Sequence, residues 1–232
     1  MISVIIPTMW RAQHIQYMLP MLDKHPLIGE IILIDNEKQS ANLELINSTK
    51  KLVYLPQEQN IFVNPAWNLG AQLSKNNVLM FLNDDCLVNL NGLYKVYNEI
   101  DSSKGLFGFS ELSYCGLAIE MFDSLKRNSM GDYVTIEESY GTDELSGMPH
   151  FSYGSVMLCH KESYYEIPEE FKIYFGDLFI YTMNRVKGKK NYVIEDGLVL
   201  TKMSSTVSSA NPQIEKERQI FYDVFKRYGI NC

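Results

Sequence analysis

Residues 78–85 read VLMFLNDD, five large apolar side chains followed by one amide and two carboxylates. A continuous apolar run of this length is typical of a strand that is buried on both faces, as in a parallel sheet. Upstream segments show the same form, because each is short and apolar and stops at proline or at a polar residue. We expect strands at Ser3–Ile6, stopped by Pro7, at Glu30–Ile34, at Leu52–Leu55 and at Val78–Leu82.

Helical patterns lie between these strands. Apolar residues from Ile15 to Leu22 recur at the spacing of one helix face, and Pro20 is expected to kink or shorten that helix. Pro65–Leu73 is predicted to be a second helix, with proline in its first turn and Asn64 as its N-cap. Strands that alternate with helices predict an α/β fold with a mostly parallel central sheet flanked by helices.

The clean alternation is lost from about residue 102. Residues 123–147 are rich in Ser, Gly, Asp, Glu and Asn, and we interpret them as long loops with one strand-like piece at Val134–Ile136. No repeat or linker is visible, so residues 1–232 are predicted to form a single domain with an irregular C-terminal half. Regular elements are expected again at Gly154–Cys159, Asp177–Val186, Tyr192–Ile194 and Leu198–Lys202, and in a final helix that begins at Asn211-Pro212.

Composition and charge exclude several classes of protein. The net charge is −7 and no polybasic block occurs, which disfavours nucleic acid or an anionic membrane surface as a partner. The apolar runs are the length of strands, so no transmembrane segment or signal peptide is predicted. The four cysteines lack zinc-ligand spacing, and reduced thiols in a cytoplasmic protein are the expectation; they are Cys86, Cys115, Cys159 and Cys232.

Polar side chains follow three of the predicted strands. In an open parallel sheet, ligands bind beyond the carboxyl ends of the strands, so Thr8, Asp35, Asp84 and Asp85 are expected to line one pocket. No glycine-rich phosphate loop is present, whereas two adjacent carboxylates suit Mg²⁺ or Mn²⁺, which can bridge phosphate oxygens. Turns also favour Asn and Asp, so the residues alone leave both interpretations open.

These residues carry a family resemblance. The segments that carry it are Val4–Thr8, Ile31–Asn36, Asn60, Ala66–Gly70 and Phe81–Asp85, followed by Tyr174–Asp177, the helix to Val186 and Lys187–Lys189. Their order and spacing resemble a glycosyltransferase of family 2 with the GT-A fold. The resemblance implies a nucleotide-sugar-binding half at residues 1–100 and an acceptor-binding half at residues 101–232.

The resemblance also implies the chemistry and its residues. A sugar would move with inversion from a UDP-, dTDP- or GDP-linked donor to a hydroxyl of a glycan or lipid-linked acceptor, in a hexosyl- or deoxyhexosyl-transferase reaction assisted by Mn²⁺ or Mg²⁺. A hydroxyl of high pKa must lose its proton as it attacks, which requires a base. The implied roles are catalytic base for Asp177, metal binding for Asp85 and Asn83, and donor binding for Pro7, Thr8, Arg11, Asp35, Asn68 and Asp84.

The chain departs from the family pattern at three positions. Gly176 replaces a common acidic residue, Asn83 replaces a common Asp, and Lys202 lies where many relatives have His. Without the resemblance, Asp177 would be explained as a first-turn acid of its helix. Two alternatives therefore stay open: a nucleotide-sugar-binding protein without catalysis, and a sugar nucleotidyltransferase, although the glycine-rich basic loop expected of the latter is missing after Thr8.

Other side chains have weaker claims to a role. His150 lies beside the expected acceptor region, but an ordinary loop histidine is the simpler interpretation. Trp67 can stack on a ring, yet a core aromatic on a helix is commoner. Arg11 is as well explained by a solvent-facing charge. Candidate stacking platforms for the acceptor are Tyr114, Tyr133, Tyr140 and Tyr153.

Overall fold

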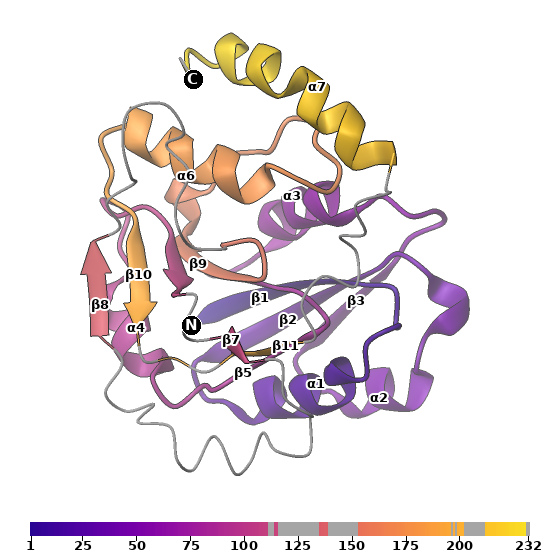
Figure 1. Cartoon of the computed structure of the whole chain (residues 1–232). Helices are drawn as coiled ribbons and strands as arrows, with labels where there is room; N and C mark the ends of the chain where they lie inside the picture. Colours follow the sequence, from indigo (N-terminus) through magenta and orange to yellow (C-terminus); the bar gives the residue numbers. More distant parts are fainter. Residues whose placement is uncertain are drawn as a thin grey trace.

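The computed structural model of the chain describes residues 1–110, 114–115, 135–138, 153–195, 197, 199–201 and 212–230. Their main feature is an eight-stranded sheet with the order β3-β2-β1-β4-β9-β6-β10-β8 (Figure 1). β9 runs antiparallel to β4 and β6, and β8 runs antiparallel to β10, while the other neighbours are parallel. The strands are β1 Ile2–Thr8, β2 Ile28–Asp35, β3 Leu52–Pro56, β4 Val78–Leu82, β6 Phe107–Phe109, β8 Thr135–Glu138, β9 Val156–His160 and β10 Tyr192–Glu195.

Helices cover both faces of this sheet. α3, α6 and α7 lie over one face, and α1 and α2 lie on the opposite side (Figure 1). A small second sheet, with the order β5-β11-β7, pairs strands from distant parts of the sequence. These elements are α1 His14–Lys24, η1 Lys38–Ser40, α2 Leu43–Ser48, α3 Val63–Leu73, β5 Cys86–Val88, α4 Leu93–Glu99, β7 Tyr114–Cys115, η5 Lys161–Ser163, α6 Gly176–Val186, β11 Val199–Thr201 and α7 Pro212–Arg227.

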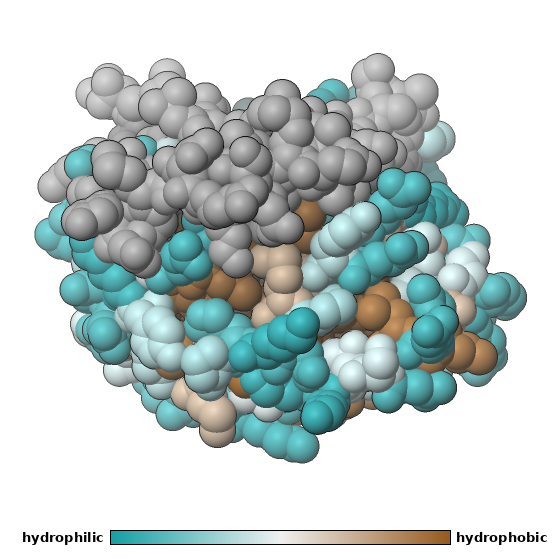
Figure 2. Space-filling view, turned by 90° about the horizontal axis from the view of Figure 1, so that it is seen from below, coloured by the Kyte–Doolittle hydropathy of each residue, from teal (hydrophilic) through white to brown (hydrophobic). Residues whose placement is uncertain are grey.

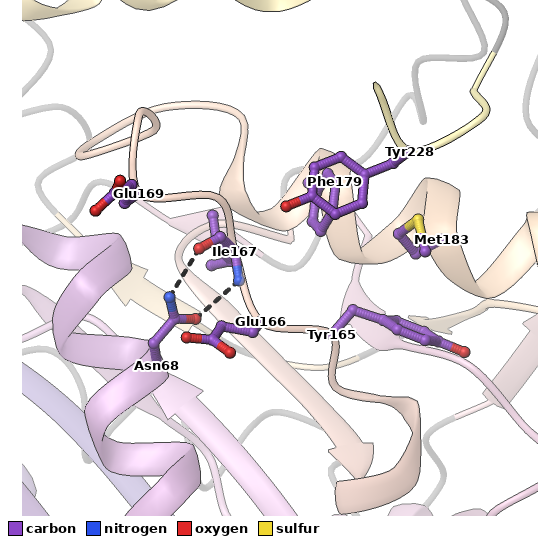
Figure 3. A pocket seen from close by; sticks show the side chains of 8 residues that line it. All are labelled: Asn68, Tyr165, Glu166, Ile167, Glu169, Phe179, Met183 and Tyr228. Atoms are coloured by element: carbon purple, nitrogen blue, oxygen red, sulfur yellow. Dashed lines mark hydrogen bonds between the residues drawn. The ribbon is translucent and has the colours of Figure 1, made fainter. Parts of the chain in front are cut away.

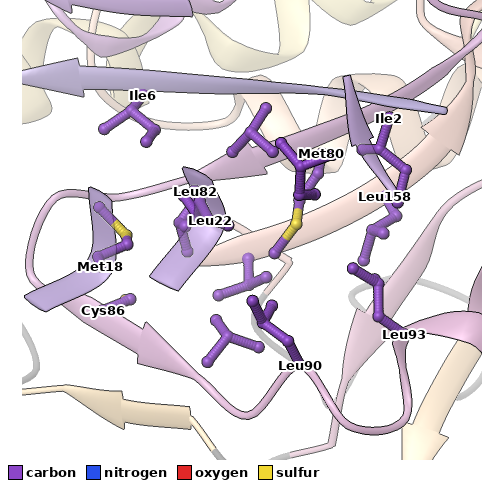
Figure 4. Close-up of a cluster of buried hydrophobic side chains, with 14 of the residues drawn as sticks. Ile2, Ile6, Met18, Leu22, Met80, Leu82, Cys86, Leu90, Leu93 and Leu158 are labelled. Carbon is purple, nitrogen blue, oxygen red and sulfur yellow. The ribbon is translucent and has the colours of Figure 1, made fainter. Parts of the chain in front are cut away.

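Alternating side chains of the central strands build two separate cores. Ile6, Met80 and Leu82 point to the side of α1 and α4, where they pack with Met18 and Leu22 (Figure 4). The residues between them in sequence point the other way, toward α3, α6 and α7. Burial on both faces explains why the central strands are continuously apolar, and it confirms the α/β class with a mostly parallel sheet.

The outer face below the sheet is largely hydrophilic, with smaller apolar areas between the polar side chains (Figure 2). Exposed large apolar side chains on the described elements include Tyr17 of α1 and Leu43 of α2. None of the described helices is both long and apolar enough to cross a membrane.

The prediction that Pro7 stops the first strand was wrong. β1 continues through Pro7 to Thr8, and Pro7 is aligned with Ile34 of β2. The backbone N–H of Asn36 donates to the Thr8 carbonyl, so the backbone of Thr8 faces β2 and that of Pro7 faces the β4 side. Pairing with β4 has already ended at Ile5, so the missing N–H of proline removes no ladder hydrogen bond there.

Two helix boundaries also differ from expectation. α1 continues past Pro20 to Lys24 and contains 11 residues. α3 begins at Val63, with Phe62 rather than Asn64 at the N-cap position. Asn64 is buried inside the first turn, where its side-chain amide donates to the carbonyls of Phe171 and Tyr174 instead of capping the helix.

Candidate active site

The carboxyl ends of β1, β2 and β4 meet at one edge of the sheet. Thr8 and Asp35 are the last residues of β1 and β2 and lie opposite each other in the strand register. The Thr8 hydroxyl donates to Asp84 Oδ2 at 2.7 Å, and the backbone N–H of Met9 approaches the same oxygen at 3.4 Å. The structure therefore brings Thr8, Asp35 and Asp84 together, and we call this group with Asp85 the donor edge.

Asp35 is completely buried at the donor edge. Its Oδ2 accepts a hydrogen bond from the Tyr54 hydroxyl at 2.6 Å, and its Oδ1 accepts one from the Glu37 backbone N–H at 2.9 Å. Burial and the neighbouring Asp35 raise the pKa of Tyr54, so Tyr54 stays protonated and acts as a donor. Both carboxylate oxygens of Asp35 are thus held by neighbours.

Ionisation of the Asp84 carboxyl costs free energy in the folded protein. Burial raises the pKa of its carboxyl from 3.8 to about 6, the Thr8 hydrogen bond opposes this shift, and the negative charge of Asp85 adds to it. The difference corresponds to about 3 kcal/mol for ionising Asp84 in the fold. A cation beside the two carboxylates would offset this cost.

The chemistry of this acidic pair fits a divalent cation. Within the part of the chain that the structure describes, no group of three or more His, Cys, Asp or Glu side chains could hold a metal ion. Mg²⁺ commonly uses only one or two protein carboxylates and completes its shell with substrate phosphates and water. Asp85, with Asn83 and Asp84 beside it, meets that requirement, and oxygen donors of this kind suit Mg²⁺ and Mn²⁺.

Gly154 connects the donor edge to Asp177. The Asn83 side-chain amide donates to the Gly154 carbonyl at 3.1 Å, and the Asn83 backbone N–H donates to the Ser155 carbonyl at 3.0 Å. The Gly154 backbone N–H lies close enough to the Asp177 carboxylate to lower the pKa of that carboxyl. A Cβ atom at Gly154 would lie 3.1 Å from Asp177 Oδ2, so glycine lets the two segments approach closely.

Asp177 lies in the first turn of α6 and is the one acidic residue in that turn. Burial raises the pKa of its carboxyl, while hydrogen bonds from the backbone N–H groups of Leu178, Asp177 and Gly154 act in the opposite direction. A general base works best when its pKa lies near the working pH, and the raised pKa of this carboxyl is closer to neutral pH. Gly154 packs against this carboxylate and binds Asn83, so the carboxylate lies next to the carboxyl end of β4.

Two predicted donor-binding residues lie near the donor edge without touching its carboxylates. Pro7 is the penultimate residue of β1, directly before Thr8. Arg11 is largely exposed and forms an ion pair with Glu37 at 3.2 Å. Since the Glu37 backbone N–H binds Asp35, Arg11 lies over the loop that follows β2.

Asn68 is held in a different environment. Its Oδ1 accepts hydrogen bonds from the Tyr164 hydroxyl and the Ile167 backbone N–H, and its Nδ2 donates to the Ile167 carbonyl. It borders a cavity of about 470 Å³ whose other walls come from the chain after η5, from α6 and from Tyr228 (Figure 3). Among the described residues, no hydrogen bond joins Asn68 to the donor edge or to Asp177.

Two aromatic candidates belong to the core. Trp67 is buried and packs edge-on against Phe81, which confirms the core interpretation. Tyr153 is 1% exposed and its hydroxyl donates to the Tyr192 carbonyl, so the prediction that it offers a stacking platform was wrong. The strand pattern around it did not reveal that its ring packs against Tyr181. His150, Tyr133, Tyr140 and Lys202 lie outside the described residues, and of Tyr114 only the backbone is described.

Sequence reasoning missed Tyr54, Gly154 and Glu37 as neighbours of the site. Tyr54 lies in a predicted strand, and its alternation with Val53 signals only that it points to one face. Gly154 and Glu37 contribute backbone groups, which leave no signature in side-chain chemistry. The one signal available for Tyr54 is its polar hydroxyl, which is unusual in an apolar strand and can bind an acid at the end of another strand, such as Asp35.

Comparisons with known proteins place the chain in a family. The sequence profile described as Glycosyl transferase family 2 matches residues 3–161. No curated protein sequence matches the chain. The fold is similar to that of S. aureus TarS 1-349 in complex with UDP-GlcNAc, with a TM-score of 0.61 and 17% identity over 97% of this chain and 66% of that chain.

A second similar structure is that of GalNAc-T7 with UDP, GalNAc and Mn²⁺, with a TM-score of 0.56 and 14% identity. That match covers 98% of this chain and 50% of the other. This chain therefore spans less than two thirds of the length of these structures. Because the family profile covers more than half of the sequence and the fold agrees with the GT-A architecture, the chain belongs to glycosyl transferase family 2.

Proposed function

We propose that the chain transfers a sugar from a nucleotide-diphosphate donor to an acceptor hydroxyl, with inversion and with the assistance of Mn²⁺ or Mg²⁺. The observation that carries the proposal is the connection from Asp84 and Asp85 through Asn83 and Gly154 to Asp177. It sets a pair of carboxylates suited to a cation beside a single carboxylate suited to accept a proton. Both groups are needed when a diphosphate leaves and a hydroxyl attacks.

The two similar structures support a UDP-linked donor as the first choice, since one was solved with UDP-GlcNAc and the other with UDP and GalNAc. We further propose that residues 1–100 bind the donor and that residues 101–232 bind the acceptor. The position of Thr8, Asp35 and Asp84 at one sheet edge supports the first assignment. A hexosyl- or deoxyhexosyl-transferase is the class that follows, with a glycan or lipid-linked acceptor.

In the proposed mechanism, each side chain has a limited task. Thr8 fixes the orientation of the Asp84 carboxylate by donating to Oδ2. Asp177 accepts the proton of the acceptor hydroxyl while that oxygen forms its bond to the anomeric carbon and the nucleoside diphosphate departs with the bonding electrons. A divalent cation held by Asp85, with Asn83 and Asp84 nearby, would offset the charge that develops on the diphosphate.

The single carboxylate in the first turn of α6 supports the proposal of inversion. Asp177 is the only acid in the first turn of α6, because its neighbour is Gly176. A single base that removes a proton supports direct displacement, in which the sugar carbon is attacked from the face opposite the leaving group. Neither a covalent sugar intermediate nor a second carboxylate is needed for this route.

The test is a donor panel of UDP-, dTDP- and GDP-linked sugars with Mn²⁺ or Mg²⁺, in which release of nucleoside diphosphate and the anomeric configuration of the product are measured. We expect turnover with one donor class and loss of turnover in Asp85→Asn. Asp223→Asn, an exposed acid on α7, is the matched control.

Other outcomes would replace the proposal. Donor binding without transfer to any acceptor would indicate a nucleotide-sugar-binding protein. Release of pyrophosphate from a nucleoside triphosphate would indicate a sugar nucleotidyltransferase.

A further inference from the structure

The five residues Phe171–Phe175 lead directly into α6 and Asp177, yet they form no helix or strand. Their backbone N–H groups converge on one side chain. Those of Lys172, Ile173 and Tyr174 donate to the carboxylate of Glu217 at 2.9, 3.1 and 2.7 Å. We call Phe171–Phe175 the base segment, because the proposed base follows it.

Glu217 is a completely buried residue of α7. Gln213, one turn earlier on the same helix, donates its side-chain amide to Glu217 Oε1 at 3.0 Å. No ion pair involves Glu217 within the described parts of the chain. A buried carboxylate is costly unless hydrogen bonds satisfy it, and here most of its donors are the backbone groups of the base segment.

The carbonyl groups of the base segment are held from the opposite side by α3. Asn64 Nδ2 donates to the carbonyls of Phe171 and Tyr174 at 3.2 and 2.9 Å. The Asn64 backbone N–H donates to the Lys172 carbonyl at 3.0 Å. The base segment therefore has its donors bound by α7 and its acceptors bound by α3, in place of a strand ladder.

The junction with α6 has little freedom of its own. Phe175 has a left-handed φ of 60°. A Cβ atom at Gly176 would lie 2.3 Å from Asn64 Oδ1, so Gly176 is packed directly against the side chain that holds the base segment. A displacement of the base segment would therefore be transmitted through Gly176 to Asp177, the residue that follows it.

α7 has a second attachment that does not depend on Glu217. Phe221 and Phe225 of α7 pack against Phe175 and Phe179, with ring centroids 4.6 and 5.8 Å apart in these two pairs. Aromatic packing of this kind is expected to keep α7 in place when the charge of Glu217 is removed. The function of the carboxylate can thus be separated from the docking of the helix.

We propose that Glu217 is a positioning residue that fixes the base segment, and through it Asp177, relative to the donor edge. The inference rests on the proposed role of Asp177 as base. It also assigns a task to α7, which lies beyond residues 3–161 matched by the family profile. The expected consequence is that Glu217 affects the chemical step and leaves donor binding unchanged.

The test compares Glu217→Gln with Glu215→Gln, an exposed residue of the same helix. In Glu217→Gln the side-chain amide keeps one acceptor oxygen. Its NH₂ group replaces the other oxygen, so a donor then faces the backbone N–H donors of the base segment. We expect kcat to fall about 10- to 100-fold, because misplacement of a catalytic group by about 1 Å has effects of this size. The donor KM and the Kd for UDP should stay unchanged, hydrogen exchange of residues 172–177 should become faster, and Glu215→Gln should behave like the unsubstituted protein.

The outcomes separate this inference from the proposed function. Normal kcat in Glu217→Gln, with an active unsubstituted protein, would overturn the positioning role alone. Equal losses of kcat and UDP affinity would show that the whole site is disturbed, rather than the position of Asp177 alone, and would also overturn it. An unsubstituted protein that turns over no donor would overturn the proposed function, and the inference with it.

Two further variants complete the test, and the first keeps it decisive if Glu217→Gln does not fold. Asn64→Ser removes the amide donor on the α3 side and should show the same loss of kcat with unchanged UDP affinity. Glu217→Asp keeps the carboxylate and should recover part of the lost kcat. Failure of both expectations in folded variants would reject the positioning role.

Discussion

The donor edge and the base segment belong to the same proposed site, and they are held by different kinds of interaction. Thr8 and Asp35 belong to adjacent parallel strands, and Asp84 lies two residues beyond a third, so a ladder of backbone hydrogen bonds sets their positions. The base segment has no ladder and is bound by Glu217 and Asn64, from helices that are remote in sequence. One side is therefore determined by strand pairing and the other by two buried side chains.

This difference shows how the two sides should respond to change. A residue of the donor edge can be replaced while the sheet still places its neighbours. A residue that supports the base segment has no such substitute, because each of its hydrogen bonds is made by a particular side chain.

Replacing the base should separate activity from stability. In Asp177→Asn we expect transfer to fall about 10²- to 10⁴-fold, the usual contribution of a general base. Burial raises the pKa of Asp177, so the fold holds the protonated form more tightly than the unfolded chain does, and the neutral amide should be no less stable near pH 7. Initial rates and thermal melting measure the two effects. A rate within about threefold of the unsubstituted protein would remove Asp177 from the mechanism.

Replacing Asp84, a partly buried acid of the donor edge, should increase stability in the absence of divalent cations. The pKa of Asp84 is raised to about 6 from 3.8, so its ionisation destabilises the fold fully above about pH 6 and not at all below about pH 4. Asp84→Asn is therefore expected to gain up to about 3 kcal/mol of unfolding free energy at pH 8, with the gain vanishing toward pH 4.

Urea unfolding at several pH values measures this gain. Asp223→Asn, which alters an exposed acid on α7, is the control and should show no pH-dependent gain. A gain in Asp84→Asn that grows as the pH falls would have the wrong sign and would contradict the assignment.

Two glycines provide a comparison between the base segment and the core, because each is packed against a single side chain. A Cβ atom at Gly176 would lie 2.3 Å from Asn64 Oδ1, and one at Gly70 would lie 2.3 Å from Ile5 Cγ2 in the core beneath β1. Both alanine variants are expected to lose about 1–3 kcal/mol of stability through overpacking. Below their melting temperatures, only Gly176→Ala should also lower kcat.

Melting curves combined with kcat measured on folded protein test the pair. Equal kcat values for the two variants would mean that overpacking at the base segment affects catalysis no more than overpacking in the core.

An effect on stability is also expected at the support of Asp35. Tyr54→Phe removes the hydroxyl that donates to Asp35 Oδ2 at 2.6 Å and leaves a buried carboxylate oxygen with one donor fewer. We expect a loss of about 1–3 kcal/mol of unfolding free energy, measured by chemical unfolding. Tyr94→Phe, at an exposed tyrosine, is the control. A neutral Tyr54→Phe would indicate that water replaces the phenol.

Much of the fold and of the donor edge could be predicted from the sequence. The predicted strands near Ser3, Glu30, Leu52 and Val78 are all present, because a strand buried on both faces needs a continuous apolar run. Their polar ends meet because parallel strands end at a common edge. The helix that begins near Asp177 was also predicted, and α6 begins at Gly176.

Other features could not be predicted, and each depends on a partner far away in the sequence. Asn64 resembles an N-cap in its local sequence but binds carbonyls more than 100 positions later. Tyr153 resembles an exposed loop aromatic but is buried by β10 and α6. Glu217 resembles a surface acid in a helix rich in charges, and only its burial shows that it binds the base segment.

By itself, the sequence determined the α/β class, the order of the central strands along the chain and the acidic ends of β2 and β4, because the periodicity of apolar residues and the polar strand ends are local properties. Tertiary structure alone decided that Gly154 lies between Asn83 and Asp177 and that α3 and α7 hold the segment before Asp177. These contacts are close packing of the backbone and hydrogen bonds between backbone groups and distant side chains. Their geometry exists only after the layers have packed, and for that reason no local pattern records them.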